Sequence, residues 1–167
     1  MRIVGIDPGI SPAVACLDPL GLKFDGFRVD DLLEGGVDAA IPLVAILRRL
    51  DPDVVYLENV GPMPGQGLSS TSRFMLAYGI IRGVLATLRA PVVLVVPSVW
   101  KKGVLPDSAF EEKKDKALRK DLQKQAAVDF CRLHYPGIAL MHGRCVRPDH
   151  NIAEAVCLAH FGLENYS

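Results

Sequence analysis

The sequence predicts an α/β protein in which helices pack on the faces of a mixed β-sheet. Three observations indicate this class: short β-branched segments near the N-terminus, two later apolar strands, and helical spacing of apolar residues between and after them. Half of the 167 residues are apolar, which is enough for a sizeable core. Because neither a repeat nor a second core is visible, we expect one domain over residues 1–167.

The first third of the chain alternates short apolar segments with turns. Gly and Pro separate three initial strands, which indicates an antiparallel meander. A helix with apolar residues at helical spacing follows, and Asp51-Pro52 ends it before a fourth strand. The expected elements are strands at 2–7, 13–17 and 23–29, a helix at about 37–50 and a strand at 53–58.

The rest of the chain is expected to be mostly helical. A loop rich in Gly and Ser precedes a long apolar helix, and the strand after that helix is apolar throughout, so we expect it to be covered on both faces. The expected elements are a loop at 61–70, a helix at about 71–88, a strand at 91–96, a turn at 98–102, a loop at 105–115, and helices at about 116–134 and 150–162.

Charge and cysteine usage narrow the class of protein. The formal charge is zero, with 19 basic and 19 acidic residues, which argues against general polyanion binding. Residues 101–124 nevertheless carry a local positive excess, which indicates either a phosphate-binding face or a solvated helix of mixed charge. No signal peptide or membrane span is visible, so we expect a cytoplasmic protein. The cysteines lack CxxC spacing and are expected to be reduced; they are Cys16, Cys131, Cys145 and Cys157.

Acidic residues fall at the ends of the expected elements. Asp7 ends the first strand before Pro8-Gly9, and Glu58 ends the strand at 53–58. If these strands are neighbours, both carboxylates project at one edge of the sheet. Glu154 lies near the start of the last helix, on the face of His150 or Asn151.

Converging carboxylates repel one another unless a hard cation lies between them, so the pattern predicts a Mg²⁺ site. Two ions about 4 Å apart would suit phosphoryl transfer. Each acid also has a structural alternative. Asp7 would be a turn residue, Glu58 the partner of a basic side chain, and Glu154 a first-turn acid favoured by the helix dipole.

Six motifs together resemble a known family. They are GIDPG at 5–9, the strand that ends in Glu58, MPGQGLSS at 63–70, YGIIRGVL at 78–85, PSVWKKGV at 97–104 and AEAVCLA at 153–159. Their order along almost the whole chain resembles the RuvC-type Holliday junction resolvases of the RNase H-like superfamily, and the shorter versions in phages and some bacteria most of all. The resemblance implies an RNase H-like fold, with a mixed five-stranded sheet and helices on both faces.

The resemblance also implies a function. Members are Mg²⁺-dependent endonucleases, active with Mn²⁺ as well, that bind four-way DNA junctions as homodimers and nick strands of like polarity symmetrically. They use no nucleotide cofactor, and such a protein would work in a bacterial cell or a phage-infected host. Asp7, Glu58 and Glu154 match three of the family's four acids. For the fourth we favour Asp149, with His150 second, because Asn151 stands where bacterial members carry Asp or His.

The family's DNA contacts map onto two segments. Lys101 and Lys124 match lysines that reach backbone phosphate, and nearby charge comes from Lys102, Arg119 and Lys120. The segment 61–74 resembles the junction-probing loop; Ser69 is a candidate contact, and Phe74 or Met63 a candidate wedge between bases. Phe74 has core packing as its alternative. Trp100 is expected to anchor its turn in the core.

Three other functions remain open at this point. The first is a nuclease of the same fold with a broader substrate range that includes branched or flap DNA. The second is a junction-binding module without catalytic activity, suggested by the irregular fourth ligand. The third is an actin-like ATP-binding domain, which also begins with a strand, an Asp and a Gly. Its usual need for two such domains argues against it in 167 residues.

Overall fold

A five-stranded mixed sheet forms the centre of the computed structural model, which describes residues 1–18, 24–34, 36–62, 65, 67–110, 116–141, 143 and 147–166. Within these residues the strand order is β3-β2-β1-β4-β5. The strands are β1 (Ile3–Asp7), β2 (Ala13–Leu17), β3 (Phe24–Arg28), β4 (Val54–Glu58) and β5 (Val92–Val95). The predicted α/β class and the mixed sheet are confirmed.

The pairing of the strands places the ends of β1 and β4 side by side. β1, β2 and β3 form the predicted antiparallel meander, whereas β4 runs parallel to both β1 and β5. In the β1–β4 register Ile6 pairs with Leu57, so the next residues, Asp7 and Glu58, follow at the same edge. The pairing confirms that the two strands are neighbours. Because they are parallel, their carboxyl ends meet at one edge of the sheet.

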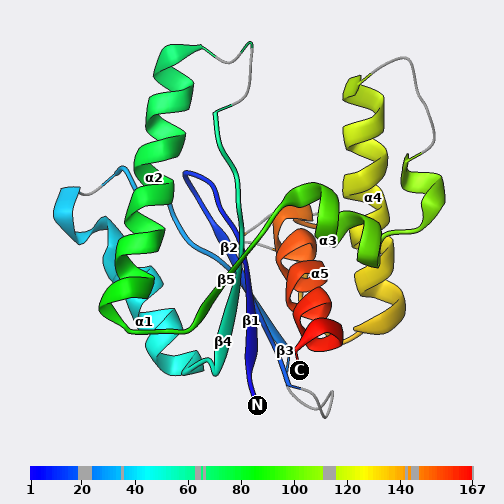
Figure 1. Cartoon of the computed structure of the whole chain (residues 1–167), viewed down its shortest axis with the longest axis horizontal. Coiled ribbons are helices and arrows are strands. Elements are labelled where there is room, and N and C mark those ends of the chain that lie inside the picture. Colours follow the sequence, from blue (N-terminus) through cyan, green and yellow to red (C-terminus); the bar gives the residue numbers. More distant parts are fainter. Residues whose placement is uncertain are drawn as a thin grey trace.

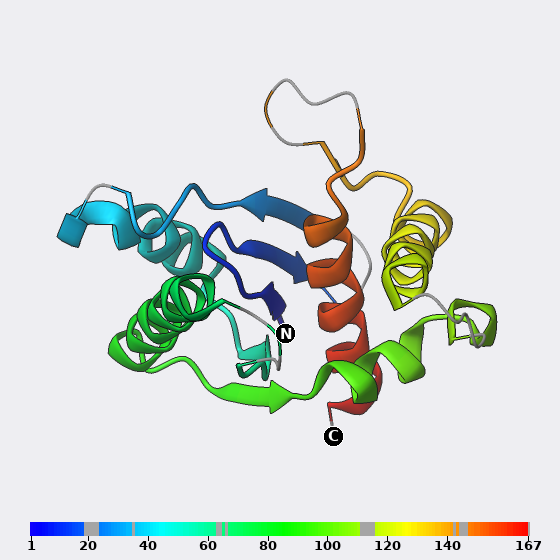
Figure 2. The ribbon, with the colours of Figure 1, turned by 90° about the horizontal axis from the view of Figure 1, so that it is seen from above.

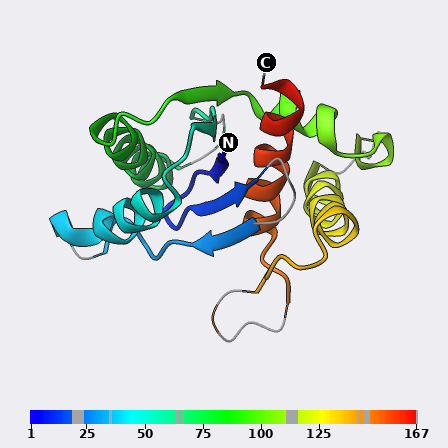
Figure 3. The same ribbon diagram turned by 90° about the horizontal axis from the view of Figure 1, so that it is seen from below.

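Helices cover both faces of the sheet (Figure 1). η1 (Gly36–Ala40), α1 (Ile41–Leu50) and α2 (Leu68–Thr87) lie on one side, and α3 (Pro97–Val104), η2 (Asp107–Phe110), α4 (Lys116–His134) and α5 (His150–Asn165) lie on the other. Seen from above and below, α5 lies directly on the sheet and α4 packs on the outside of α5 (Figures 2 and 3). Each face has its own apolar core.

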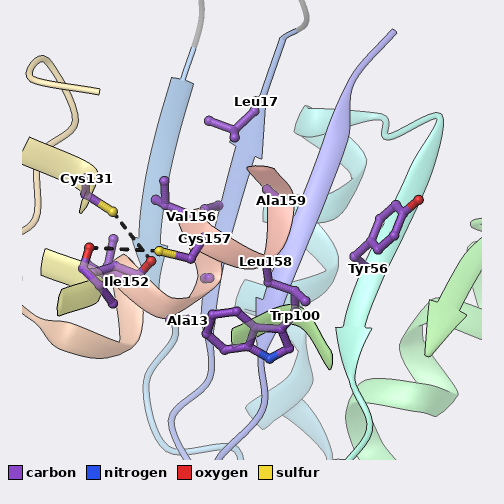
Figure 4. Packing of buried hydrophobic residues seen from close by; sticks show 14 of the residues in the cluster. Ala13, Leu17, Tyr56, Trp100, Cys131, Ile152, Val156, Cys157, Leu158 and Ala159 are labelled. Atoms are coloured by element: carbon purple, nitrogen blue, oxygen red, sulfur yellow. Dashed lines mark hydrogen bonds between the residues drawn. The ribbon is translucent and has the colours of Figure 1, made fainter. Parts of the chain in front are cut away.

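The buried helix α5 approaches β1 more closely than side chains would normally allow. A Cβ at Gly5 would collide with the carbonyl oxygen of Ala155 and would lie 2.6 Å from the backbone nitrogen of Ala159. Only glycine permits this contact between strand and helix. Figure 4 shows the resulting cluster, in which Val156 and Leu158 of α5 join side chains from the neighbouring elements. The close approach holds α5 against β1.

Three expectations about single elements are wrong. Residues 98–102 are not a turn but part of α3, because Pro97 stands at the helix start, where its fixed φ favours helix and its missing N–H is not needed. The segment 105–115 is not loop throughout, since it contains η2, and 111–115 lie outside the described residues. β5 is not covered on both faces, because it is the sheet edge and three of its residues are 39–43% exposed.

Further observations concern membrane spans, cysteines and the start of α2. No helix among the described residues has the length and apolarity needed to cross a bilayer. Cys16, Cys131 and Cys157 are buried and not disulfide-bonded, while Cys145 lies outside the described residues. Helix α2 begins at Leu68, three residues before the expected start, and its inner face packs into the core.

Candidate functional site

Three carboxylates from distant parts of the sequence converge where β1 and β4 end. Asp7 and Glu58 follow the alternation that places Ile3, Gly5 and Tyr56 on the α5 side of the sheet. Glu154 reaches the same place from the second turn of α5. Glu58 and Glu154 are each only 8% exposed. The convergence predicted from the strand and helix ends is therefore present.

The electrostatics of the carboxylates show that they act on one another. Burial raises the pKa of Asp7 well above its usual range, and repulsion from Glu154 and Glu58 adds to the effect. Burial also raises the pKa of Glu58, and repulsion from Glu154 raises it further. A hydrogen bond from Trp100 and the charge of Lys101 lower it in part. A cluster of this kind attracts positive charge, because a cation would relieve both burial and repulsion.

Lys101 supplies positive charge inside the cluster. Its Nζ lies 2.6 Å from Oε1 of Glu154, and the two side chains are only 19% and 10% exposed. Burial alone would lower the pKa of Lys101, but the charges of Glu154, Glu58 and Asp7 together raise it. Lys101 was expected to contact DNA phosphate. In this structure it is the ion-pair partner of Glu154.

Trp100 orients the second carboxylate. Its Nε1 donates a hydrogen bond to Oε1 of Glu58 over 2.9 Å, and the ring is 1% exposed, which confirms that Trp100 is anchored in the core. Because Trp100 and Lys101 are consecutive in α3, one short helix binds both Glu58 and Glu154. α3 thus fixes a carboxylate from the sheet and another from α5.

The start of α5 carries the candidates for a fourth ligand. Asp149 is the N-cap of the helix: its Oδ1 accepts a hydrogen bond from the backbone N–H of Asn151 at 2.9 Å and also binds Nη1 of Arg28 in β3 at 3.2 Å. Burial and then the charge of Lys124 lower the pKa of His150, while Glu154 acts in the opposite direction. His150 is therefore within electrostatic reach of Glu154, whereas the Asp149 carboxylate caps the helix and ties it to β3.

The predicted phosphate-binding residues lie on two helices, α3 and α4. Lys102 is exposed on α3, and Arg119 and Lys120 are exposed on α4. Lys124 of α4 lines a cavity of about 560 Å³ together with Arg132, Arg147 and His150. Asp121 lines the same cavity, which therefore lies between α4 and the start of α5 and carries more basic than acidic side chains.

The residues taken as junction-probing lie at the start of α2. Ser69 is exposed in the first turn of the helix, and Phe74 is half-buried one turn further on. Met63 lies outside the described residues.

The donor set fits a hard divalent cation in its chemistry. Mg²⁺ prefers carboxylate oxygens, and the three acids are held together with a repulsion that such an ion would remove. The described residues nevertheless contain no ready-made group of three or more His, Cys, Asp or Glu side chains that could hold a metal ion. Glu154 is paired with Lys101 instead, and Glu58 with Trp100.

Sequence reasoning missed two residues of the site. Arg28 binds Asp149 and lowers the pKa of Asp7 against the larger effect of burial, but an Arg near the end of a strand gives no signal of either contact. Trp100 was expected to be only a core residue. Its position directly before Lys101 in PSVWKKGV was the available signal, because that motif is where the family resemblance places a functional lysine.

The fold and the site define an α/β protein with acids gathered at the carboxyl edge of a mixed sheet. No family model and no curated protein matches the sequence, whereas solved structures match its fold. The Thermus thermophilus RuvC structure with a Holliday junction substrate has a TM-score of 0.62 and 18% identity, covering 98% of this chain and 95% of that one. A second T. thermophilus RuvC structure gives 0.60 and 17%, covering 98% and 96%. The chain therefore has the RuvC fold, which is RNase H-like.

Proposed function

We propose that this protein is a metal-dependent endonuclease that resolves four-way DNA junctions. The observation that carries the proposal is the convergence of Asp7, Glu58 and Glu154 at one edge of a sheet with the RuvC fold. The T. thermophilus RuvC to which the chain is similar was solved with a Holliday junction substrate. The cleavage proposed is a pair of symmetric nicks in strands of like polarity, carried out by a homodimer.

Asp7, Glu58 and Glu154 would hold Mg²⁺ or Mn²⁺, in two ions, with Asp149 or His150 as a further ligand. When bound, these ions supply an activated water and stabilise the departing 3′ oxygen of the cut strand. The protein's own contribution is positional. Trp100 holds one oxygen of Glu58, and the close packing of α5 on Gly5 holds Glu154 beside the strand ends.

The basic surface of α3 and α4 would bind the DNA backbone. Lysine suits a phosphate contact because it is a mobile point charge that reads no sequence. Lys124 and its neighbours in the cavity lie beside the start of α5, which would place a strand near the acids. Further phosphate contacts are proposed for Lys102, Arg119 and Lys120, and junction contacts for Ser69 and Phe74.

The exposed side of β5 supports the proposed homodimer. Val92, Val93 and Leu94 are 39–43% exposed on an edge strand, which is a surface that proteins usually cover. A hollow of about 280 Å³ lined by Arg82, Leu94 and other residues lies between α2 and β5. We expect the wild-type mass in light scattering to be that of a dimer, and Leu94→Lys to lower it; a monomeric wild type would contradict the proposal.

The test of the nuclease is a cleavage assay on a four-way junction with mapped cut sites. In Mg²⁺ the wild type should make symmetric nicks. Asp7→Asn should bind the junction and leave it intact, because it removes a metal ligand without altering the basic surface. Asp107→Asn is the matched control, since Asp107 is exposed in η2, away from the acidic cluster. Cleavage by Asp7→Asn would refute the metal site.

The same assay separates the alternatives. Equal cleavage of a Y-fork would indicate a broader branched-DNA nuclease. Tight binding without cleavage in either Mg²⁺ or Mn²⁺ would indicate an inactive junction-binding module. We expect no nucleotide cofactor, so ATP should leave the melting temperature unchanged while Mn²⁺ raises it. The reverse result would favour an actin-like ATP-binding domain.

A further inference from the structure

The position of Lys101 is more specific than a general basic surface requires. Its ammonium group is mostly buried, it contacts Glu154 at 2.6 Å, and it interacts electrostatically with Glu58 and Asp7 as well. Its charge therefore acts on all three carboxylates that would hold metal, and its direct contact is with Glu154. Its Nζ lies 5.1 Å from the centre of the Trp100 indole ring. Lys102, the next residue of α3, is exposed.

A divalent cation and this ammonium group would need the same oxygen atoms. When the three acids and Lys101 are ionised, the cluster keeps two uncompensated negative charges, which is the charge of one divalent ion. Oε1 of Glu154 accepts a hydrogen bond from Lys101. A metal ion bound to the same oxygen would bring two cations into direct repulsion.

We propose that Lys101 is an internal counter-ion of the acidic cluster, which divalent metal must displace from Glu154 in order to bind. The inference rests on the proposed function, because it concerns the metal site of that nuclease. Lys101 keeps the acids together in the metal-free protein and at the same time weakens metal binding. It thereby regulates the metal concentration at which the site fills. Lysine can make this change because its flexible stem allows the ammonium group to move without moving α3.

The test is calorimetric titration of the full chain with Mn²⁺, without DNA, so that the measurement is independent of cleavage. Lys101→Met keeps the length of the side chain and removes its charge. We expect it to bind Mn²⁺ roughly tenfold more tightly than the wild type, equivalent to about 1.4 kcal/mol. Lys102→Met is the matched control, because it removes the same charge from the adjacent exposed position, and its effect should be within about twofold.

A second variant and a second measurement separate charge from shape and folding. Lys101→Arg keeps the positive charge and should retain the weaker affinity of the wild type. Circular dichroism melting in EDTA should show Lys101→Met folded but less stable than the wild type, with a larger rise in Tm on adding Mn²⁺. Together these results would show that competition, and not loss of structure, changes the affinity.

The outcomes distinguish the inference from the function on which it rests. If the wild type binds Mn²⁺ and Lys101→Met binds it no more tightly than Lys102→Met does, Lys101 is not a competing counter-ion, and the proposed metal site still stands. If Lys101→Met binds more weakly than the wild type, Lys101 supports the ligands and the inference is wrong. If neither the wild type nor any variant binds Mn²⁺, the metal site fails and the inference fails with it.

Discussion

The contact between Gly5 and α5 gives a sharp prediction about stability. Gly5→Ala would place a Cβ against the carbonyl oxygen of Ala155 and 2.6 Å from the backbone nitrogen of Ala159. Both are backbone atoms of a buried helix, so neither can rotate away, and the whole of α5 has to shift. Overpacking of a core by one methyl group costs about 1–3 kcal/mol, and we expect the upper end of that range here. For a chain of this size the corresponding fall in Tm is roughly 6–12 °C.

Gly79→Ala is the matched control. Gly79 lies inside α2, and a Cβ there would meet nothing within 4 Å. Alanine is the better helix former by about 1 kcal/mol, so this variant should be more stable than the wild type. The same chemical change thus has opposite signs at the two positions. The assay is urea unfolding, in which a change of midpoint at constant m reports stability.

The two glycines should also differ in function. A shift of α5 moves Glu154 away from Asp7, so Gly5→Ala should cleave junctions more slowly even at temperatures where it is fully folded. Gly79→Ala should cleave at the wild-type rate. If Gly5→Ala has the wild-type urea midpoint, α5 does not lie against β1 as described, and the reasoning that positions Glu154 is wrong.

The remaining predictions concern individual side chains of the site. Trp100→Phe keeps a buried ring but removes the N–H group that donates a hydrogen bond to Glu58. In urea unfolding the stability should fall by about 1.5–3 kcal/mol, and in a ¹³C NMR titration the pKa of Glu58 should rise further. An unchanged titration would show that the bond is absent. Because the pKa of Asp7 is raised in the folded state, its ionisation opposes folding: stability is greatest below the unfolded pKa and is lost as pH rises through the folded one. Asp7→Asn should therefore raise the Tm of the metal-free protein at pH 7 and change it little near pH 3, and a destabilising effect at pH 7 would contradict this sign. Lys124→Ala should reduce the slope of log K against log salt for junction binding by about 0.9, measured by fluorescence anisotropy, and an equal slope would exclude a phosphate contact.

Much of the fold was predictable because its signals are local. The β-branched segments before Asp7 and Glu58 end abruptly, and the turns between the first strands restrict those strands to a meander. The exposure of β5 was not predictable, because an apolar strand has the same sequence pattern at the centre of a sheet as at its edge. What decides its place is the pairing of β4 with both β1 and β5, which no local pattern encodes.

The site likewise contains a part that was predictable from the sequence and a part that was not. Acids at the ends of parallel strands were expected to meet, because sheet geometry brings such ends together. The pairing of Lys101 with Glu154 joins α3 to α5 across 53 positions, and Lys101 alone looks like any other residue of a basic segment. Whether a lysine faces solvent or a carboxylate depends on the angle at which its helix leaves the sheet, and that angle is a property of the packed structure.

The choice between Asp149 and His150 as fourth ligand shows how a contact changes the weight of a sequence argument. From the sequence Asp149 was favoured, with His150 second, on the strength of the family resemblance. Its Oδ1 already accepts hydrogen bonds from Asn151 and Arg28, so binding metal through that atom would uncap α5 and leave a partly buried arginine without its partner. His150 lies four residues before Glu154, on the same helix face. Burial lowers the pKa of His150, which favours the neutral imidazole, the form that can bind a metal ion. We therefore propose His150 as the fourth ligand, while Asp149 caps α5 and ties its start to β3.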